Sequence, residues 1–185
     1  MRIVAGKFRG RTLASPPDNS IRPTSDRVRE SVFDILSSRL GPDLGGARVL
    51  DLFAGTGALG LEALSRGASY AMFVDSGIAA RALIRDHIQI FGVAAASKLL
   101  KRDATSLGTI ERFRPFDLVF LDPPYGKGLG ERALASARDG GWLVAGALIV
   151  LEEKKGVALD LPEGFTLEDE RVYGDTVVRF LASES

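Results

Sequence analysis

Two short stretches of the sequence carry the residues whose types and spacing could do chemistry. The first is Asp122-Pro123-Pro124-Tyr125, which directly follows the apolar run 116–121. Two consecutive prolines hold their φ angles at about −65° and supply no N–H donors, so this loop is stiff and rich in carbonyl acceptors. An ionised Asp122 only accepts hydrogen bonds. The carboxylate and the Pro123 carbonyl could thus take both hydrogens of an amino group and aim its nitrogen at an electrophile.

Tyr125 suggests what kind of molecule carries that amino group. Its ring offers a flat face on which a base taken out of its stack can lie. Guanine suits an anionic acceptor, because its N1–H and N2 amino groups are adjacent donors. The alternative is a rigid Asp-Pro-Pro-Tyr turn with structural duties only.

The second stretch is the glycine-rich run 48–60. Val49-Leu50 is a short apolar segment that ends at Asp51, as in a buried strand that opens into a turn. Gly55 and Gly57 then allow positive φ and close approach of a ligand to the backbone, and strong helix formers follow from residue 58. A strand, a glycine turn and a helix put unpaired backbone N–H groups where open α/β sheets bind nucleotides.

The charges near this turn narrow the ligand. Gly55-x-Gly57-x-x-Gly60 also satisfies the dinucleotide fingerprint, which alone is weak evidence. Asp51 would repel phosphates but suits a cationic amino or sulfonium group. Asp75 follows a second apolar run and could accept hydrogen bonds from ribose hydroxyls. S-adenosylmethionine fits, because it combines a positively charged amino-acid tail, a ribose and an adenine. The alternative is a glycine turn that only allows close packing.

A third strand is predicted at 98–102, and Asp103-Ala104 follows it. A polar residue at that strand end could accept a hydrogen bond from the adenine amino group. A loop or cap aspartate fits Asp103 equally well. His87 lies on a predicted helix, and without partner residues a surface or packing role is expected for it.

Composition excludes several classes of protein. The chain has 185 residues, 45% of them hydrophobic, which suits one α/β domain with a small appendage. No apolar run approaches the roughly 18 residues that span a membrane, and the start lacks the long apolar region of a secretory signal. There are no cysteines and one histidine, so we expect no metal site, no disulfide and a cytoplasmic location.

Charge is distributed unevenly although the formal net charge is zero. Residues 1–29 contain seven Lys or Arg and two Asp, a net of +5. Such asymmetry indicates a basic arm that meets an anion, most often nucleic acid, although a solvated surface is the alternative. The arm contains the basic residues Lys7, Arg9, Arg11, Arg22, Arg27 and Arg29.

The elements that must position these residues follow from hydrophobic periodicity. Two short strands around 2–5 and 10–14 form a basic hairpin, and a helix begins with Thr24 or Ser25 as its cap. Strands alternate with helices as far as the strand 147–151, which predicts a parallel sheet with helices on both faces. The last two strands, 171–173 and 176–180, lie on either side of Gly174-Asp175 and form a hairpin and so an antiparallel edge. We expect an appendage at 1–21 and a main domain at 22–185.

Four motifs together resemble the RsmD family of bacterial methyltransferases, which modify guanine N2 in 16S ribosomal RNA of the small subunit. They are Gly6-Lys-Phe-Arg-Gly-Arg-Thr-Leu13, Arg22-Pro-Thr-Ser-Asp-Arg-Val-Arg-Glu30, Asp51-Leu-Phe-Ala-Gly-Thr-Gly-Ala-Leu-Gly-Leu-Glu-Ala-Leu-Ser-Arg66 and Asp122-Pro-Pro-Tyr125. The last two are shared by amino-methyltransferases in general, and the two basic motifs narrow the match. Tyr125 stands where some members have Phe, and either ring can stack.

The resemblance implies a Rossmann-like class I S-adenosylmethionine-dependent methyltransferase fold. Its sheet would be seven-stranded and mostly parallel, with an antiparallel C-terminal hairpin and a small basic N-terminal β-hairpin. Asp122 to Tyr125 would hold the guanine, and the basic N-terminal residues would contact RNA. The cofactor would contact Asp51, Phe53, Ala54, Gly55, Thr56, Gly57, Asp75, Asp103 and Ala104.

The resemblance also implies partners and leaves rivals. The substrate would be 16S ribosomal RNA within an assembled or assembling small subunit, with ribosomal proteins nearby, and the enzyme is expected to be a monomer. One rival is another amino-methyltransferase, acting on DNA adenine or protein glutamine. Another is a non-catalytic RNA-binding factor in ribosome assembly. A third alternative, a nicotinamide-dependent dehydrogenase, is supported by the glycine pattern alone.

Overall fold

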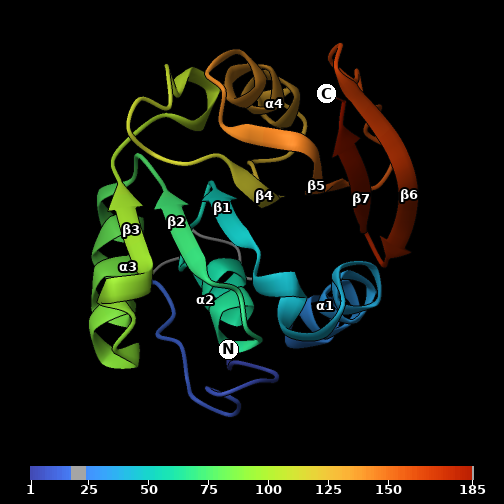
Figure 1. The fold of residues 1–185 in the computed structure, drawn as a ribbon. Helices are drawn as coiled ribbons and strands as arrows, with labels where there is room; N and C mark the ends of the chain where they lie inside the picture. The colour runs from blue at the N-terminus through green and yellow to red at the C-terminus, as the bar shows by residue number, and fades with distance from the viewer. Residues whose placement is uncertain (18–23, 185) are drawn as a thin grey trace.

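The protein is built on a single twisted sheet (Figure 1). The computed structural model describes residues 1–17 and 24–184. Within them, seven strands lie in the order β3-β2-β1-β4-β5-β7-β6. In chain order these are β1 (Arg48–Leu52), β2 (Tyr70–Val74), β3 (Ser97–Leu100), β4 (Phe116–Leu121), β5 (Leu143–Lys154), β6 (Phe165–Tyr173) and β7 (Thr176–Ser183).

The first five strands pair in parallel, and β7 joins the sheet antiparallel to both β5 and β6. This arrangement confirms the predicted parallel sheet with an antiparallel C-terminal edge. The strand order reverses direction at β1, since β2 lies on one side of it and β4 on the other. Ligands of open α/β sheets bind at such a switch point, beyond the carboxyl ends of the strands.

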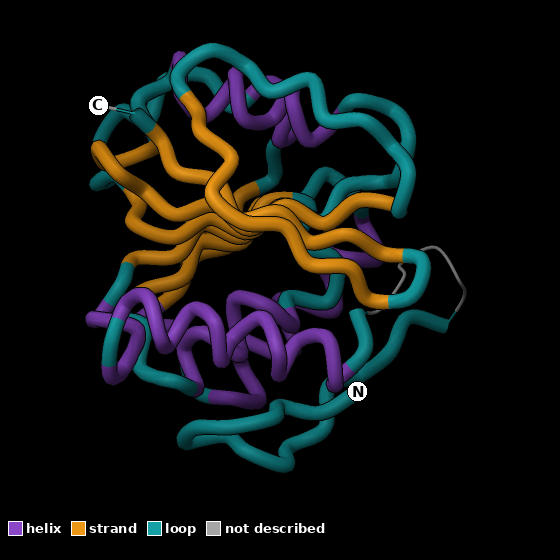
Figure 2. The backbone as a smooth tube through the Cα atoms, turned by 90° about the vertical axis from the view of Figure 1, so that its right-hand side faces the viewer, coloured by secondary structure: helices purple, strands orange, loops and turns teal. Residues whose placement is uncertain are grey.

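Helices cover both faces of the sheet (Figure 2). On one face are α1 (Asp26–Leu40), α2 (Ala58–Ser65) and α3 (Ile78–Phe91), and on the other is α4 (Leu129–Asp139). Alternate residues of the central strands supply the two cores: Val49 packs toward α1, α2 and α3, and Leu50 packs toward α4. Three short 3-10 helices are η1 (Pro42–Gly46), η2 (Ala94–Ala96) and η3 (Ala104–Ser106).

Helix α1 begins where the sequence predicts. Ser25 is its N-cap, with a side-chain oxygen that accepts a hydrogen bond from the Val28 N–H at 3.2 Å. Asp26 in the first turn adds a favourable interaction with the helix dipole. Val32 and Leu36 on the next turns are buried against the sheet.

The N-terminal hairpin is present but its ladder is shorter than predicted. Arg2 and Thr12 form one antiparallel bridge, and neither predicted strand extends beyond it. The reason is that nearby backbone N–H groups donate hydrogen bonds to helix α2 and not across the hairpin. The Val4 and Ala5 N–H groups donate to the buried Glu62 carboxylate, at 2.9 and 3.0 Å.

Ile3 and Leu13 of this hairpin are both 1% exposed and join the core formed by α1, α2 and α3. The basic hairpin is therefore packed onto the main domain through its apolar residues. The predicted boundary between residues 21 and 22 lies within residues 18–23, outside the described part of the chain. No helix within the described ranges is long and apolar enough to cross a membrane.

Candidate active site

Both chemical motifs open onto one cavity of about 870 Å³. In the parallel ladders Leu52 pairs with Val74 on one side and with Leu121 on the other, so β1, β2 and β4 end at the same level. The loops that follow these strands therefore meet at one edge of the sheet. Gly55 and Asp122, from the two motifs, line the same cavity. Pockets of this size commonly hold ligands as large as a nucleoside derivative.

The loop after β1 has the backbone geometry that the glycines permit. Gly55 has φ 59°, and Gly57, with φ 79°, is the N-cap residue of α2. Phe53 also has a positive φ, 55°, although it carries a side chain, and it lines the cavity. Bulky residues rarely adopt this conformation, and such strain concentrates at ligand sites.

Asp51 is a carboxyl group buried at the bottom of this loop. It is 1% exposed, and its Oδ2 accepts a hydrogen bond from the Gly60 N–H at 3.0 Å. Burial raises the pKa of Asp51 from 3.8 to about 8; the Gly60 bond opposes this rise and the charge of Asp75 adds to it. A cation in the cavity would stabilise the ionised carboxylate.

Gly60, the third glycine of the motif, serves packing rather than loop flexibility. A Cβ at this position would lie 2.4 Å from Phe73 Cε1 and 3.1 Å from Asp51 Oδ2. Only glycine lets α2 lie this close to β2 and bring its N–H to Asp51.

Asp75 is oriented by backbone donors. Its Oδ2 accepts from the Gly55 N–H at 3.0 Å and its Oδ1 from the Gly77 N–H at 2.8 Å. An ionised carboxylate has about four acceptor positions, so two lone pairs are left toward the cavity. Two adjacent ribose hydroxyls are ligands of matching chemistry.

Asp103 both caps η3 and lines the cavity, so the two readings of this residue are compatible. Its Oδ1 accepts from the Thr105 N–H at 2.8 Å and the Thr105 hydroxyl at 2.7 Å. These hydrogen bonds hold the pKa of Asp103 below its ordinary value. The group is thus an ionised acceptor at the cavity edge.

All four residues of Asp122-Pro123-Pro124-Tyr125 line the same cavity as the glycine loop. Asp122 Oδ2 lies 3.4 Å from the Thr24 hydroxyl oxygen. The Tyr125 hydroxyl donates to Glu152 Oε1 at 2.7 Å, and Pro123 is buried. The Tyr125 hydroxyl and the buried Pro123 therefore hold the loop in place.

The structure places most of the predicted site residues at the cavity and some of them elsewhere. Seven of the nine cofactor candidates line the cavity, whereas Gly57 and Ala104 do not. Gly57 faces Phe73 and Ile84 in the core, and Ala104 is 4% exposed. These two shape the loops but do not face the cavity. Among the RNA candidates, Lys7, Arg9, Arg11 and Arg27 are exposed, and Arg22 lies outside the described residues.

The prediction that Arg29 binds RNA is wrong. Its side chain is 0% exposed and lies between α1 and α2. It forms ion pairs with Asp26 at 2.7 Å and with the fully buried Glu62 at 3.7 Å, and it donates to the Arg2 carbonyl. A buried guanidinium needs such partners. Arg29 is a structural cation that ties the N-terminal segment to the domain.

His87 has the packing role expected of it. It is 1% exposed, and its Nε2 accepts from the Ala14 N–H at 3.0 Å. Its Nδ1 therefore carries the proton and donates to the Thr56 carbonyl at 2.8 Å. The ring joins the N-terminal segment to the glycine loop. No group of three or more potential ligands in the described residues is arranged to hold a metal ion.

Several cavity residues were not predicted from the sequence. Thr24 and Leu129 reach the cavity from helix starts, and Arg132 brings a basic side chain to it from α4. Ile78 is 81% exposed and also lines the cavity, at the start of α3. The signal for Ile78 in the sequence is its place at the first position of the predicted helix, three residues after Asp75.

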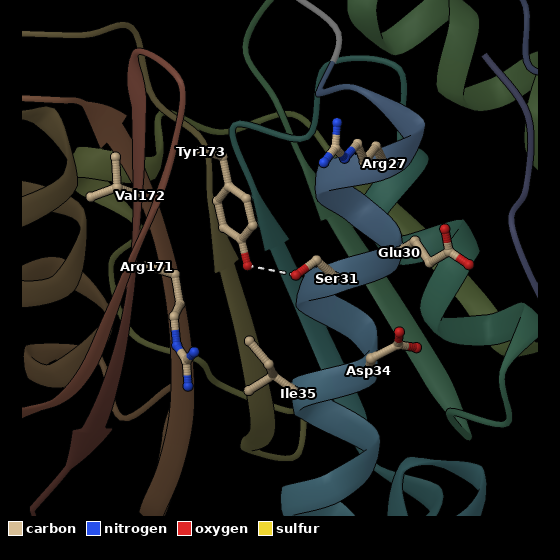
Figure 3. Close-up of a pocket in the computed structure, with 8 residues that line it drawn as sticks. All are labelled: Arg27, Glu30, Ser31, Asp34, Ile35, Arg171, Val172 and Tyr173. Atoms are coloured by element: carbon tan, nitrogen blue, oxygen red, sulfur yellow. Dashed lines mark hydrogen bonds between the residues drawn. The ribbon is translucent and has the colours of Figure 1, made fainter.

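A second, open groove of about 560 Å³ lies between α1 and β6 (Figure 3). Arg27, Glu30 and Asp34 reach it from the helix, and Arg171 from the strand. Ser31 Oγ and Tyr173 Oη lie 2.7 Å apart and close the space between the two elements. None of the residues predicted to hold cofactor or guanine lines it.

The strand order, the reversed β7 and the cavity at the carboxyl edge define the Rossmann-like fold of S-adenosylmethionine-dependent methyltransferases. The family model described as "Conserved hypothetical protein 95" matches residues 1–182. The chain belongs to this family, the RsmD family.

Individual relatives agree over nearly the whole chain. "Ribosomal RNA small subunit methyltransferase D" of Escherichia coli (strain K12) is 36% identical over 187 residues, which cover 100% of this chain and 91% of that protein. The protein of the same name from Haemophilus influenzae is 34% identical, with 94% and 89% covered. The structure described as "Putative methyltransferase yhhF from Escherichia coli" has a TM-score of 0.83 at 33% identity and covers 100% of this chain and 98% of its own.

Proposed function

We propose that this protein transfers a methyl group from S-adenosylmethionine to the exocyclic N2 amino group of a guanine in 16S ribosomal RNA. The observation that carries the proposal is the shared cavity: the acidic glycine loop and the Asp122 loop line one space. The names of the curated relatives, ribosomal RNA small subunit methyltransferases, support the substrate class.

The residues on the glycine side fit S-adenosylmethionine. The buried Asp51 carboxyl, with its raised pKa, would be stabilised as an anion by the cationic end of the ligand. Asp75 would hold the ribose hydroxyls, and Asp103 the adenine amino group. The cofactor supplies an activated methyl group on its sulfonium.

The residues on the other side fit a purine with an amino group. Asp122 and the Pro123 carbonyl would accept its hydrogens and direct the nitrogen lone pair toward the methyl carbon. Tyr125 would stack on the ring. The amino nitrogen would take the methyl group as the methyl–sulfur bond of the cofactor breaks, and it would then lose a proton to Asp122 or to water.

The RNA would meet the basic N-terminal hairpin. Lys7 and Arg9 are exposed beside Phe8, with the Lys7 Nζ 5.0 Å from the Phe8 ring centre. Arg11 is exposed too, but its guanidinium lies 4.3 Å from the Phe91 ring centre and donates to the Ile90 carbonyl at 2.8 Å. Lys7 and Arg9 are thus the better phosphate contacts, and Arg11 shapes the surface that presents them.

The natural substrate in this proposal is an assembled or assembling small subunit, with ribosomal proteins beside the RNA, acted on by a monomeric enzyme in the cytoplasm. The test measures transfer of labelled methyl groups to small subunits, protein-free 16S RNA, DNA and protein. We expect label in ribosomal RNA, as N2-methylguanine, and none with Asp122→Ala.

Other outcomes of these measurements would indicate one of the alternative functions. Label in DNA adenine or in protein glutamine, with none in ribosomal RNA, contradicts the proposal. Undisturbed function in cells that carry Asp122→Ala would indicate a non-catalytic assembly factor. Tight binding of a nicotinamide dinucleotide in calorimetry, without S-adenosylmethionine binding, would indicate a dehydrogenase.

A further inference from the structure

A buried carboxylate, Glu152, stands directly behind the Asp122 loop. In the parallel ladder of β4 and β5, Leu121 pairs with Leu151, so Asp122 and Glu152 are the next residues on neighbouring strands. Glu152 is 8% exposed, and it is not among the described residues that line the cavity. Any effect it has on a bound substrate must therefore pass through other side chains.

Glu152 receives hydrogen bonds from two hydroxyl groups that do line the cavity. The Tyr125 hydroxyl donates to Oε1 at 2.7 Å, and the Thr24 hydroxyl donates to Oε2 at 3.0 Å. The two hydroxyls come from distant parts of the chain: Thr24 directly precedes the cap of α1, and Tyr125 follows β4. One carboxylate therefore joins the entry to α1 with the loop after β4.

The number of hydrogens decides how this cluster is arranged. A hydroxyl group carries one hydrogen, so Thr24 cannot donate fully to both Glu152 and Asp122. Its oxygen is 3.0 Å from Glu152 and 3.4 Å from Asp122, which favours Glu152. The Thr24 hydrogen is thus directed behind the loop, away from the carboxylate that faces the cavity.

The same bond fixes the Tyr125 ring. The hydroxyl lies at the far end of the side chain, on the Cβ–Cγ axis, so anchoring it limits χ1 and fixes the direction in which the ring points. Thr176 Oγ1 lies 3.2 Å from the same hydroxyl and further restricts it. Hydrogen bonds to a carboxylate are roughly twice as strong as those between neutral groups. A ring held in this way keeps a constant place beside a base that stacks on it.

We propose that Glu152 is a positioning residue for the methyl acceptor: through Tyr125 and Thr24 it sets the orientation of the base against Asp122. This inference rests on the proposed function and assigns a role to a residue outside the cavity. It also gives a reason for Tyr rather than Phe at position 125: Glu152 accepts a hydrogen bond from the Tyr125 hydroxyl, which Phe lacks.

The first test compares Glu152→Gln with a matched control, Glu153→Gln. Glutamine has one acceptor oxygen, so it cannot receive both hydroxyls. Glu153 is also 8% exposed, but its bonds from the Gly126 and Lys154 N–H groups, at 3.1 and 2.7 Å, both reach Oε1, and a glutamine oxygen can keep them. We expect Glu152→Gln to lower kcat by about 10- to 100-fold, as small misplacements of a reacting group do. Affinity for S-adenosylmethionine should stay unchanged, and Glu153→Gln should retain the wild-type kcat.

The second test is a double-mutant cycle that combines Glu152→Gln with Tyr125→Phe. Thr24→Val is measured alongside it, as a variant that removes the other hydroxyl. Because Tyr125 acts through Glu152, the double variant should be no slower than Glu152→Gln alone. A wild-type kcat in a folded Glu152→Gln protein, or losses that multiply in the double variant, would overturn the inference. If Glu152→Gln does not fold, unchanged kcat in both Tyr125→Phe and Thr24→Val overturns it.

Assays of the wild-type enzyme distinguish a failure of this inference from a failure of the proposed function. Wild-type methylation of ribosomal RNA, together with an unaffected Glu152→Gln variant, would remove this inference alone. A wild-type protein that methylates no RNA would remove the proposed function and this inference with it.

Discussion

Replacing the buried Asp51 by asparagine should make the protein more stable at neutral pH while weakening its hold on a cation. The reason is the raised pKa, from 3.8 to about 8. Between these values the folded protein keeps a proton that the unfolded chain releases. The free energy of unfolding contributed by Asp51 therefore falls as the pH rises from about 4 to about 8. The asparagine side chain does not titrate, and its oxygen can still accept from the Gly60 N–H.

The size of the effect follows from the shift. At pH 7 the pKa of Asp51 makes the wild-type protein less stable by up to about 4 kcal/mol, at about 1.4 kcal/mol per pH unit above 3.8. Burial of the new amide costs about 1–3 kcal/mol. We expect a net gain of about 1–3 kcal/mol at pH 7, a larger gain at pH 8, and no gain or a small loss at pH 5, where the pKa contributes only about 1.6 kcal/mol.

Urea unfolding of both proteins at pH 5, 6, 7 and 8, without ligand, measures this difference. Asp139→Asn is the control, because its side chain is 69% exposed. In calorimetry at pH 7, Asp51→Asn should also bind S-adenosylmethionine at least about tenfold more weakly, because a charged partner is lost. A stability difference that does not change with pH would refute the reasoning, since Asp51 would then be ionised in the folded protein without help.

Three further predictions follow from packing and charge. Gly60→Ala should lower the free energy of unfolding by about 1–3 kcal/mol, because its Cβ would lie 2.4 Å from Phe73; unchanged urea stability contradicts this. Gly6→Ala, whose Cβ would lie 1.9 Å from the Ser65 carbonyl oxygen, should release the N-terminal hairpin to protease and abolish RNA methylation while S-adenosylmethionine still binds. Arg9→Ala should weaken RNA binding and reduce the slope of log K against log salt by about 0.7–0.9; an unchanged slope would mean that Arg9 contacts no phosphate.

The parts of the fold that the sequence predicted are those governed by local pattern. The run 116–121 is β4 with the same bounds, because a strand buried on both faces is almost entirely apolar, here with Asp117 as the exception. The cavity itself was predictable, because loops after parallel strands meet at one edge whatever the details of packing. Gly55 and Asp122 met there for that reason.

Other features depended on contacts between distant segments. Arg29 reads as a surface cation until its partner Glu62, on a different helix, is known. Strand β6 begins at Phe165, well before the predicted 171, because an edge strand with exposed faces needs no hydrophobic alternation. The Glu152 cluster joins three separate segments and leaves no local signature.

The most direct test of the central claim is mass mapping of 16S ribosomal RNA from cells with and without the gene. The proposed function predicts that one N2-methylguanine is lost with the gene, returns with the wild-type copy and does not return with Asp122→Ala. Identical methylation of the RNA in both strains would contradict it.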